Sequence, residues 1–160
     1  RKRSFMEFTQ SPPKEFGFNK SLSEYISQTS NHFQKENRRF SPDQPENEFT
    51  HTGDFTFDGV ERFISFTERQ GEVLEFIINT ISKEDTFMDA PLAMGAEDFC
   101  DFLTQESIPW EMSWDNVLFL YDNWMAFYVE DGLIDSIAWH NPEVMPYLEL
   151  LDMAFPPKTK

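Results

Sequence analysis

The side chains best suited to chemistry in this chain are carboxylates that stand next to one another. Acid–base catalysis needs two carboxylates in different environments, one of them with a raised pKa. The adjacent acids here fall in predicted turns and helix starts, where water normally surrounds both members of a pair: Glu84 and Asp85, Glu97 and Asp98, Glu130 and Asp131. We therefore predict no catalytic residue among them.

Cys100 and the three histidines also lack the spacing of a catalytic or metal site. Cys100 lies between Phe99 and Phe102 on a predicted helix, a setting typical of a free cysteine that packs as a small hydrophobe. A zinc site needs further ligands at short spacing, and the histidines are far apart in the chain: His32, His51 and His140. We predict no metal site and no cofactor.

Residues 54–59 imitate the start of a calcium-binding loop. Asp54, Asp58 and Gly59 match its first positions. The twelfth position of such a loop must be a bidentate Glu, and here it is Ser65. Asp58 is better explained as the N-terminal cap of a helix, with Phe57 as the hydrophobic staple before it.

Asp135 is the one carboxylate predicted to lie among apolar side chains, on a strand beside Tyr128 and Trp139. A carboxylate in such a place either acts as an acid with a shifted pKa or binds an Arg or Lys of a partner. We favour the second role because the surrounding chain is strongly acidic.

The distribution of charge is the most informative bulk property. The net charge is −16, and residues 84–157 contain 16 Asp and Glu with no Lys or Arg, whereas residues 1–50 have a net charge of 8 − 7 = +1. A field of one sign attracts cationic partners and repels nucleic acid and anionic membranes. We therefore expect a basic protein partner, no direct nucleic-acid binding and no membrane insertion of this segment. An acidic surface that serves only solubility is the alternative.

A three-strand meander over residues 117–139 is the clearest fold signal. Apolar runs cover 117–121, 124–129 and 133–139, and they are rich in residues that suit strands. Asp122-Asn123 and Asp131-Gly132 separate the runs and tolerate the positive φ of two-residue turns. In the first hairpin this spacing predicts the pairs Tyr121 with Trp124, Phe119 with Ala126, and Val117 with Tyr128. In the second it predicts Trp124 with Trp139, Ala126 with Ile137, and Tyr128 with Asp135.

Side chains alternate across a strand, so the meander has two faces. One face is mostly aliphatic and is the predicted core: Leu118, Leu120, Met125, Phe127, Val129, Ile134, Ser136 and Ala138. The other is aromatic, as surfaces that meet a partner often are. We predict that a partner binds this face and the acids beside it: Tyr121, Asp122, Trp124, Tyr128, Glu130, Asp131, Asp135 and Trp139. A covering helix is the alternative, and a register slip of one residue would exchange the faces.

Residues 60–81 carry the strongest helical pattern. Apolar side chains fall on one face at helical spacing: Val60, Phe63, Ile64, Thr67, Leu74, Ile78 and Ile81. Polar side chains fall on the opposite, solvent-facing side: Glu61, Ser65, Glu68, Glu72, Glu75 and Asn79. We predict one long amphipathic helix, with Gly71 on the apolar face where the sheet approaches closely. A hairpin that turns at Gln70-Gly71 is the alternative, disfavoured because strand-like alternation is poor on both sides.

The remaining segments indicate shorter helices. A capping box from Ser21 to Glu24 opens a predicted helix over about 22–38. Further helices are predicted over 96–103 and from Asn141, which Pro142 follows as a favourable first residue.

The predicted fold class is therefore α+β. A small antiparallel sheet, the three-strand meander 117–139, packs against a long amphipathic helix, with flanking shorter helices. The chain divides into a basic N-terminal extension, residues 1–48 with one helix, and an acidic α+β domain, residues 49–157.

The physical profile favours a binding protein over an enzyme. The expected function is a non-enzymatic inhibitor that neutralises a basic partner, in the manner of an immunity protein or antitoxin that blocks a nuclease-type toxin. This is an analogy of profile, not of family. The alternatives are a small enzyme or ligand-binding domain with a pocket on the aromatic sheet face, and an interaction module of a larger protein. The single cysteine, Cys100, permits a cytoplasmic location.

Overall fold

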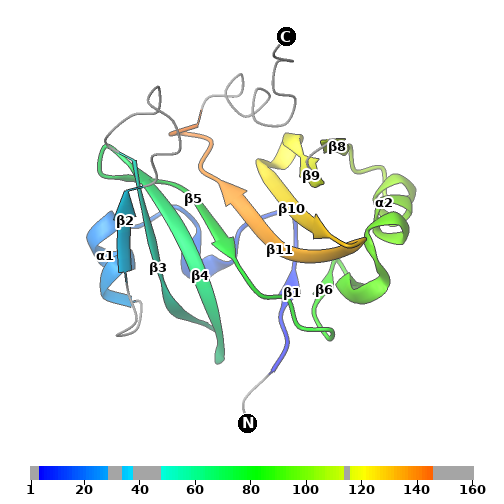
Figure 1. Ribbon diagram of the computed structural model, residues 1–160, viewed down its shortest axis with the longest axis horizontal. Coiled ribbons are helices and arrows are strands. Elements are labelled where there is room, and N and C mark those ends of the chain that lie inside the picture. Colours follow the sequence, from blue (N-terminus) through cyan, green and yellow to red (C-terminus); the bar gives the residue numbers. More distant parts are fainter. Residues whose placement is uncertain (1–3, 29–33, 38–47, 114–115, 146–160) are drawn as a thin grey trace.

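The protein is mostly β and is built on one large sheet (Figure 1). The computed structural model describes residues 4–28, 34–37, 48–113 and 116–145. The large sheet has eight antiparallel strands in the order β2-β3-β4-β5-β11-β10-β9-β8. Their bounds are Gln34–Asn37 (β2), Glu48–Phe57 (β3), Val60–Arg69 (β4), Glu72–Ile78 (β5), Glu111–Ser113 (β8), Val117–Leu120 (β9), Met125–Glu130 (β10) and Leu133–His140 (β11).

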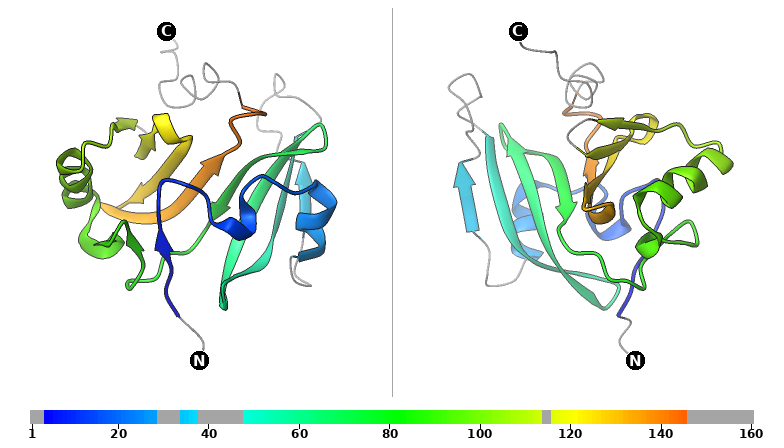
Figure 2. Two further views of the ribbon diagram at one scale, coloured as in Figure 1. Left: turned by 180° about the vertical axis from the view of Figure 1, so that it is seen from behind. Right: turned by 45° about the vertical axis from the view of Figure 1, so that its right-hand side comes forward.

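Short elements surround this sheet. A second sheet consists of β1 (Glu7–Phe8), β6 (Thr86–Phe87) and β7 (Ala90–Pro91). The α-helices in the described part of the chain are α1 (Leu22–Gln28) and α2 (Ala96–Gln105), and the 3-10 turns are η1 (Lys14–Phe16), η2 (Leu92–Met94) and η3 (Tyr121–Asn123). Figure 2 shows the N-terminal segment running across the back of the sheet, with α2 beside the turn between β10 and β11.

The long amphipathic helix predicted for residues 60–81 is wrong, because this stretch is the hairpin of β4 and β5. The chain reverses at Gln70 and Gly71, whose φ angles of 53° and 84° belong to a two-residue turn. The sequence of β4 lacks the usual alternation of apolar and polar residues. The polar Arg62 faces the core, whereas the apolar Phe63 is 42% exposed on the opposite face. The predicted fold, a three-strand meander packed on a long helix, is therefore wrong. The protein instead has a large antiparallel sheet with short helices.

A second hairpin turn occupies the residues that were interpreted as a helix cap. Asp58 and Gly59, with φ angles of 46° and 83°, connect β3 to β4. The turn predicted at Asp131 and Gly132 is confirmed and has the same form, with φ angles of 52° and 76°. Gly accepts a positive φ without strain and Asp tolerates it, so this pair of residues favours a hairpin.

The first hairpin of the predicted meander has the expected register. Phe119 pairs with Ala126, as the spacing requires. The connection is longer than the predicted two-residue turn at Asp122-Asn123, because the four residues 121–124 lie between the last paired residues, Leu120 and Met125. The chain passes through η3, and Trp124 then adopts the left-handed conformation with a φ of 51°.

The register predicted for the second hairpin is wrong. The expected pairs were Trp124 with Trp139 and Tyr128 with Asp135, and the observed pairs are Met125 with Trp139 and Tyr128 with Ser136. The ladder shifts between Tyr128 and Val129 because a β-bulge at Asp135 places one extra residue in β11. Beyond the bulge, each side chain of β11 lies on the opposite face from the one predicted.

The main core lies on one face of the sheet, here called the inner face, and the N-terminal segment packs into it. The ring of Phe16 stacks on Tyr25 at 4.0 Å and on Phe76 at 4.2 Å between centroids. Phe8 lies 5.8 Å from the ring of Trp139. Residues 4–28, from the predicted extension 1–48, thus share one core with the large sheet.

The shorter helices have mixed outcomes. The capping box is confirmed, since Glu24 N donates to Ser21 Oγ at 3.3 Å and Ser21 N to Glu24 Oε1 at 3.4 Å. The helix that follows ends at Gln28, and residues 34–37 are strand β2. The helix predicted over 96–103 is confirmed as α2. The helix predicted from Asn141 extends into residues 146–160, which lie outside the described residues, as do residues 1–3 and 38–47.

A buried ion pair explains why an arginine faces the core. Arg62 donates to both carboxylate oxygens of Asp85, at 2.7 Å and 2.8 Å, and the side chain of Asp85 is 0% exposed. Asp85 also accepts the backbone N–H groups of Met6 at 2.7 Å and Ser82 at 2.8 Å. The pair therefore joins β4, the segment before β6 and the N-terminal segment.

Candidate functional site

The structure distributes the residues predicted to bind a partner over three places. Tyr121, Trp124 and Tyr128 lie half-buried on the outer face of the sheet, opposite the main core. Trp139 instead lies in the main core and is only 1% exposed. The carboxylates of the set are exposed: Asp122, Glu130, Asp131 and Asp135.

Beyond Asp135, the predicted core face of β11 is wrong for the same reason as the register, whereas Ile134 lies in the core as predicted. After the bulge at Asp135, Ile137 and Trp139 belong to the inner core, and Ala138 belongs to the outer cluster. The extra residue lies in β11, so the residues of β9 and β10 keep the predicted faces. Leu118 and Phe127, for example, are fully buried in the inner core.

The aromatic face is partly covered by the chain itself. Trp124 Nε1 donates to the carbonyl of Met145 at 3.3 Å. Met145 is 1% exposed and packs in one cluster with Phe119 and Ala126. This region is therefore a second, smaller core rather than an open aromatic surface.

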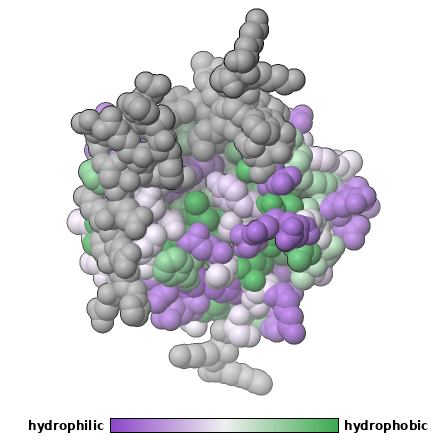
Figure 3. All heavy atoms as spheres, viewed as in Figure 1, coloured by the Kyte–Doolittle hydropathy of each residue, from purple (hydrophilic) through white to green (hydrophobic). Residues whose placement is uncertain are grey.

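Two acidic segments meet at one end of the molecule. Ala96 N, at the start of α2, donates to the carbonyl of Gly132 in the β10–β11 turn at 2.8 Å. This contact brings together five exposed carboxylates, which we call the acidic end: Glu97, Asp98, Glu130, Asp131 and Asp135. Figure 3 shows hydrophilic side chains at the right-hand edge of the molecule, where Figure 1 places α2. Leu133 lies between the acids of the turn and Asp135 and is 56% exposed.

A buried histidine and glutamate face each other on the outer face of β5 and β11. His140 and Glu75 are cross-strand partners, with Nδ1 and Oε2 3.1 Å apart and side chains 0% and 2% exposed. The distance suits an ion pair, although the alignment falls short of a hydrogen bond at Nδ1. Thr67 donates to the other Glu75 oxygen at 3.4 Å. Among the described residues, His140 Nε2 has no hydrogen-bond partner.

No pattern in the sequence indicated that His140 and Glu75 would meet. Glu75 was placed on the solvent-facing side of a helix, and only the pairing of β5 with β11 brings it to His140. The same holds for His51, whose Nε2 lies 2.6 Å from Oε1 of Glu68 across β3 and β4. For His140, the only signal of such a site in the sequence is its position at the end of the apolar run 133–139.

A cavity of about 690 Å³ borders His140 at the end of the large sheet. Its walls come from four segments: residues 10–12, 17–19, 122–124 and 139–143. Gln10 Nε2 donates to Asn123 Oδ1 at 3.0 Å and joins two of these walls. Asp122, Trp124 and Trp139, all predicted site residues, line this end-of-sheet cavity.

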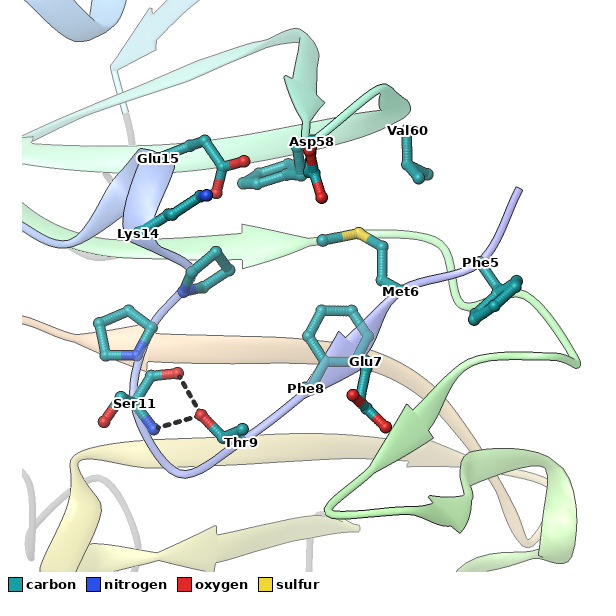
Figure 4. Close-up of a pocket in the computed structure, with 13 residues that line it drawn as sticks. Phe5, Met6, Glu7, Phe8, Thr9, Ser11, Lys14, Glu15, Asp58 and Val60 are labelled. Atoms are coloured by element: carbon teal, nitrogen blue, oxygen red, sulfur yellow. Dashed lines mark hydrogen bonds between the residues drawn. The ribbon is translucent and has the colours of Figure 1, made fainter. Parts of the chain in front are cut away.

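A smaller cavity of about 330 Å³ lies between the N-terminal segment and the β3–β4 turn. Its apolar lining includes Phe8, Phe57 and Val60. Figure 4 shows Lys14 and Glu15 next to each other at its rim. Its charged lining residues are Glu7, Lys14, Glu15 and Asp58, so three carboxylates and one lysine border this cavity.

Cys100 is buried, and burial raises the pKa of its thiol, with a further rise from the negative charge of Asp101. A raised pKa keeps the sulfur protonated at neutral pH, which disfavours the nucleophilic thiolate. Within the described ranges, no group of three or more His, Cys, Asp and Glu could hold a metal ion. No helix in that part of the chain is long and apolar enough to cross a membrane.

Comparisons of the chain with protein families, with curated proteins and with solved structures found no match. A function must therefore be inferred from the residues and from their geometry.

Proposed function

We propose that this protein binds and neutralises a basic protein partner, and that the acidic end is its docking surface. The observation that supports this proposal is the hydrogen bond from Ala96 N to the carbonyl of Gly132. It joins the first turn of α2 to the β10–β11 turn, so that carboxylates from two distant segments form one surface. Opposite charges across an interface speed association and exclude partners of the wrong sign.

The absence of cations strengthens the field at this surface. Residues 84–145 contain no Lys or Arg. Of their described acids, only Asp85 is buried, and it pairs with Arg62. The field is therefore not neutralised locally, and it extends into solvent over about 10 Å at 0.1 M salt. Leu133, 56% exposed beside these acids, offers an apolar contact at the centre of a charged rim.

The partner class follows from this chemistry. Proteins that cut or bind nucleic acid carry basic surfaces that hold phosphates, and an acidic surface is complementary to them. An immunity protein or antitoxin that blocks a nuclease-type toxin fits this description. The proposal places the protein in the cytoplasm, a compartment that its free cysteine permits.

Capture from a lysate tests the proposal. The parent and a variant with Glu97→Gln, Asp98→Asn, Glu130→Gln and Asp131→Asn are immobilised at low salt, and retained proteins are identified by mass spectrometry. We expect the parent to retain a basic protein that the variant loses. The association rate of that protein with the parent should fall by about tenfold or more between 50 and 500 mM NaCl, roughly the range seen for electrostatic steering.

The matched control changes the same amount of charge elsewhere, with Glu84→Gln, Asp89→Asn, Glu106→Gln and Glu111→Gln, all exposed positions. This control should retain the partner. A basic partner that binds all three proteins equally, or that associates at a rate independent of salt, would contradict a role for the acidic end.

A further inference from the structure

Strand β8 forms one end of the large sheet (Figure 1). We propose that β8 is a docking edge, to which an extended basic segment of a partner protein adds as a further strand. The charge of that segment rests on the proposed function, whereas the addition of a strand does not depend on the acidic end. In this mode of recognition, main-chain hydrogen bonds provide affinity and side-chain contacts provide selectivity.

The backbone of Met112 faces the open side of β8. Among the described residues, β8 pairs with β9 and with no other strand. Ser113 pairs with Val117 next to the hairpin turn, and its carbonyl accepts Asn116 N at 2.9 Å, so its backbone groups point toward β9. Successive residues of an antiparallel ladder direct their backbone groups to opposite sides. The N–H and C=O of Met112 therefore point away from β9, toward the position of an added strand.

The side chain of Met112 ends a buried row that crosses the sheet. Met112 lies opposite Leu118, and Leu118 lies opposite Phe127. Leu118 and Phe127 are 0% exposed, whereas Met112 is 37% exposed. Directly opposite residues of paired strands have their side chains on the same face. An apolar side chain opposite Met112 on an added strand would therefore continue this row and cover the methionine.

The chain that leads into β8 is held by helix α2. Ile108 N donates to the carbonyl of Leu103 at 2.9 Å, and Trp110 Nε1 donates to Thr104 Oγ1 at 2.9 Å. These bonds fix the chain immediately before the strand. An edge that is ordered in advance loses less conformational entropy when a partner binds.

The two edges of the large sheet differ in composition. At the other edge, β2 has the wholly polar sequence Gln-Lys-Glu-Asn. Lysines and other charged residues on an edge strand discourage pairing with another chain. In β8 an apolar residue stands at the centre of Glu-Met-Ser, and its three residues limit the added pairing to a short segment. Composition therefore favours strand addition at β8 over addition at β2.

The charge of this region favours a basic segment over a second copy of the chain. Residues 84–145 contain no Lys or Arg. Two copies joined at β8 would bring together two net charges of −16, which like-charge repulsion opposes. A segment in which Lys or Arg alternates with apolar residues suits both the negative field and the exposed face of Met112.

Peptide titration of the full chain, followed through its amide NMR signals, tests the inference. The probe is acetyl-Lys-Val-Lys-Val-Lys-amide, and its counterpart carries N-methyl groups on both valines. We expect saturable binding of the probe, with a shift of the Met112 amide signal. The N-methylated peptide should bind about tenfold more weakly or worse, because the methyl groups replace the donors that face Met112.

Met112→Pro tests the same contact from the protein side. The substitution removes an N–H that points away from β9, a position where an edge strand tolerates proline. It should weaken binding of the probe about tenfold and leave the far-ultraviolet circular dichroism spectrum unchanged. If this variant fails to fold, the N-methylated peptide still tests the inference on the parent chain.

The fourfold variant of the acidic end is the matched control. The acidic end includes the first turn of α2, whereas β8 follows the last turn of that helix. In 150 mM NaCl, exposed charges more than about 8 Å apart are largely screened, so this variant should bind the probe within about threefold of the parent. Loss of the probe by this variant but not by Met112→Pro would overturn strand addition and leave the proposed function standing.

Three further outcomes would overturn the inference. They are equal binding of the two peptides, no saturable binding at millimolar probe, and a dimer of the parent that Met112→Pro abolishes. Sedimentation of the parent and of Met112→Pro detects such a dimer, which would make a second copy the occupant of the edge.

Discussion

At the scale of single residues, the carboxylate of Asp85 joins three segments of the chain. It accepts hydrogen bonds from Arg62, Met6 and Ser82 while fully buried. Asp85→Ala would leave the guanidinium of Arg62 buried without its counter-charge. We expect the free energy of unfolding to fall by about 3–5 kcal/mol, the usual cost of removing one partner of a buried pair. Urea denaturation followed by far-ultraviolet circular dichroism measures this loss.

The neighbouring carboxylate provides the control. Glu84 is exposed, and Glu84→Ala should change the free energy of unfolding by no more than about 0.5 kcal/mol. If Asp85→Ala proves as mild as Glu84→Ala, then the ion pair does not hold the N-terminal segment to the sheet.

The histidines show why residue chemistry alone did not locate the candidate sites. His51 and His140 are far apart in the chain, and each meets a glutamate of a neighbouring strand. Those glutamates, Glu68 and Glu75, were assigned to the solvent-facing side of a helix. The identity of each partner follows from strand pairing, which depends on contacts distant in sequence.

At the scale of elements, Gly71 distinguishes a hairpin from a helix. Its φ of 84° lies in a region that residues with a Cβ rarely adopt. Gly71→Ala should lower the free energy of unfolding by about 1–2 kcal/mol, the cost of the left-handed conformation for an L-residue. In a helix over 60–81 the same change would instead stabilise by about 1 kcal/mol. The sign of the change in urea denaturation therefore decides between the two structures.

Gly17 serves as the matched glycine control. Its φ is −92°, and a Cβ there would lie 3.7 Å from Asn19 Oδ1, an ordinary contact. Gly17→Ala should therefore leave the stability nearly unchanged. A loss at Gly17 as large as that at Gly71 would show that the effect does not arise from the turn.

At the scale of the whole molecule, the unbalanced negative charge opposes the compact state. Like charges repel more strongly when folded together than in an extended chain, and the net charge is −16. Added salt screens exposed charges more than buried pairs such as Arg62 and Asp85. The urea midpoint should therefore rise when NaCl is increased from about 20 mM to about 500 mM, over which the screening length falls from tens of Å to a few Å.

A variant with less charge checks the cause of this stabilisation. The fourfold substitution of the acidic end, with Glu97→Gln, Asp98→Asn, Glu130→Gln and Asp131→Asn, should show a smaller rise than the parent. A midpoint that does not change with salt in the parent would mean that the exposed acids are too dispersed to repel one another measurably.

Local chemistry determined a few short elements from the sequence, although the predicted fold class was wrong. The turn at Asp131 and Gly132, the capping box at Ser21 and Glu24, and helix α2 were predicted correctly. In each case the deciding interactions lie within a few residues, where propensity and pattern are informative. The acidic character of residues 84–157 is likewise a property of the sequence alone.

Tertiary structure decided the remaining features because they depend on distant contacts. Arg62 can face the core only because Asp85 pairs with it, and this exception concealed the alternation of β4. One extra residue at Asp135 moved Trp139 from the predicted surface into the core. The end-of-sheet cavity needs the N-terminal segment beside β10 and β11, which no local pattern specifies. Side-chain alternation is local, but the face that becomes buried is set by what packs against it.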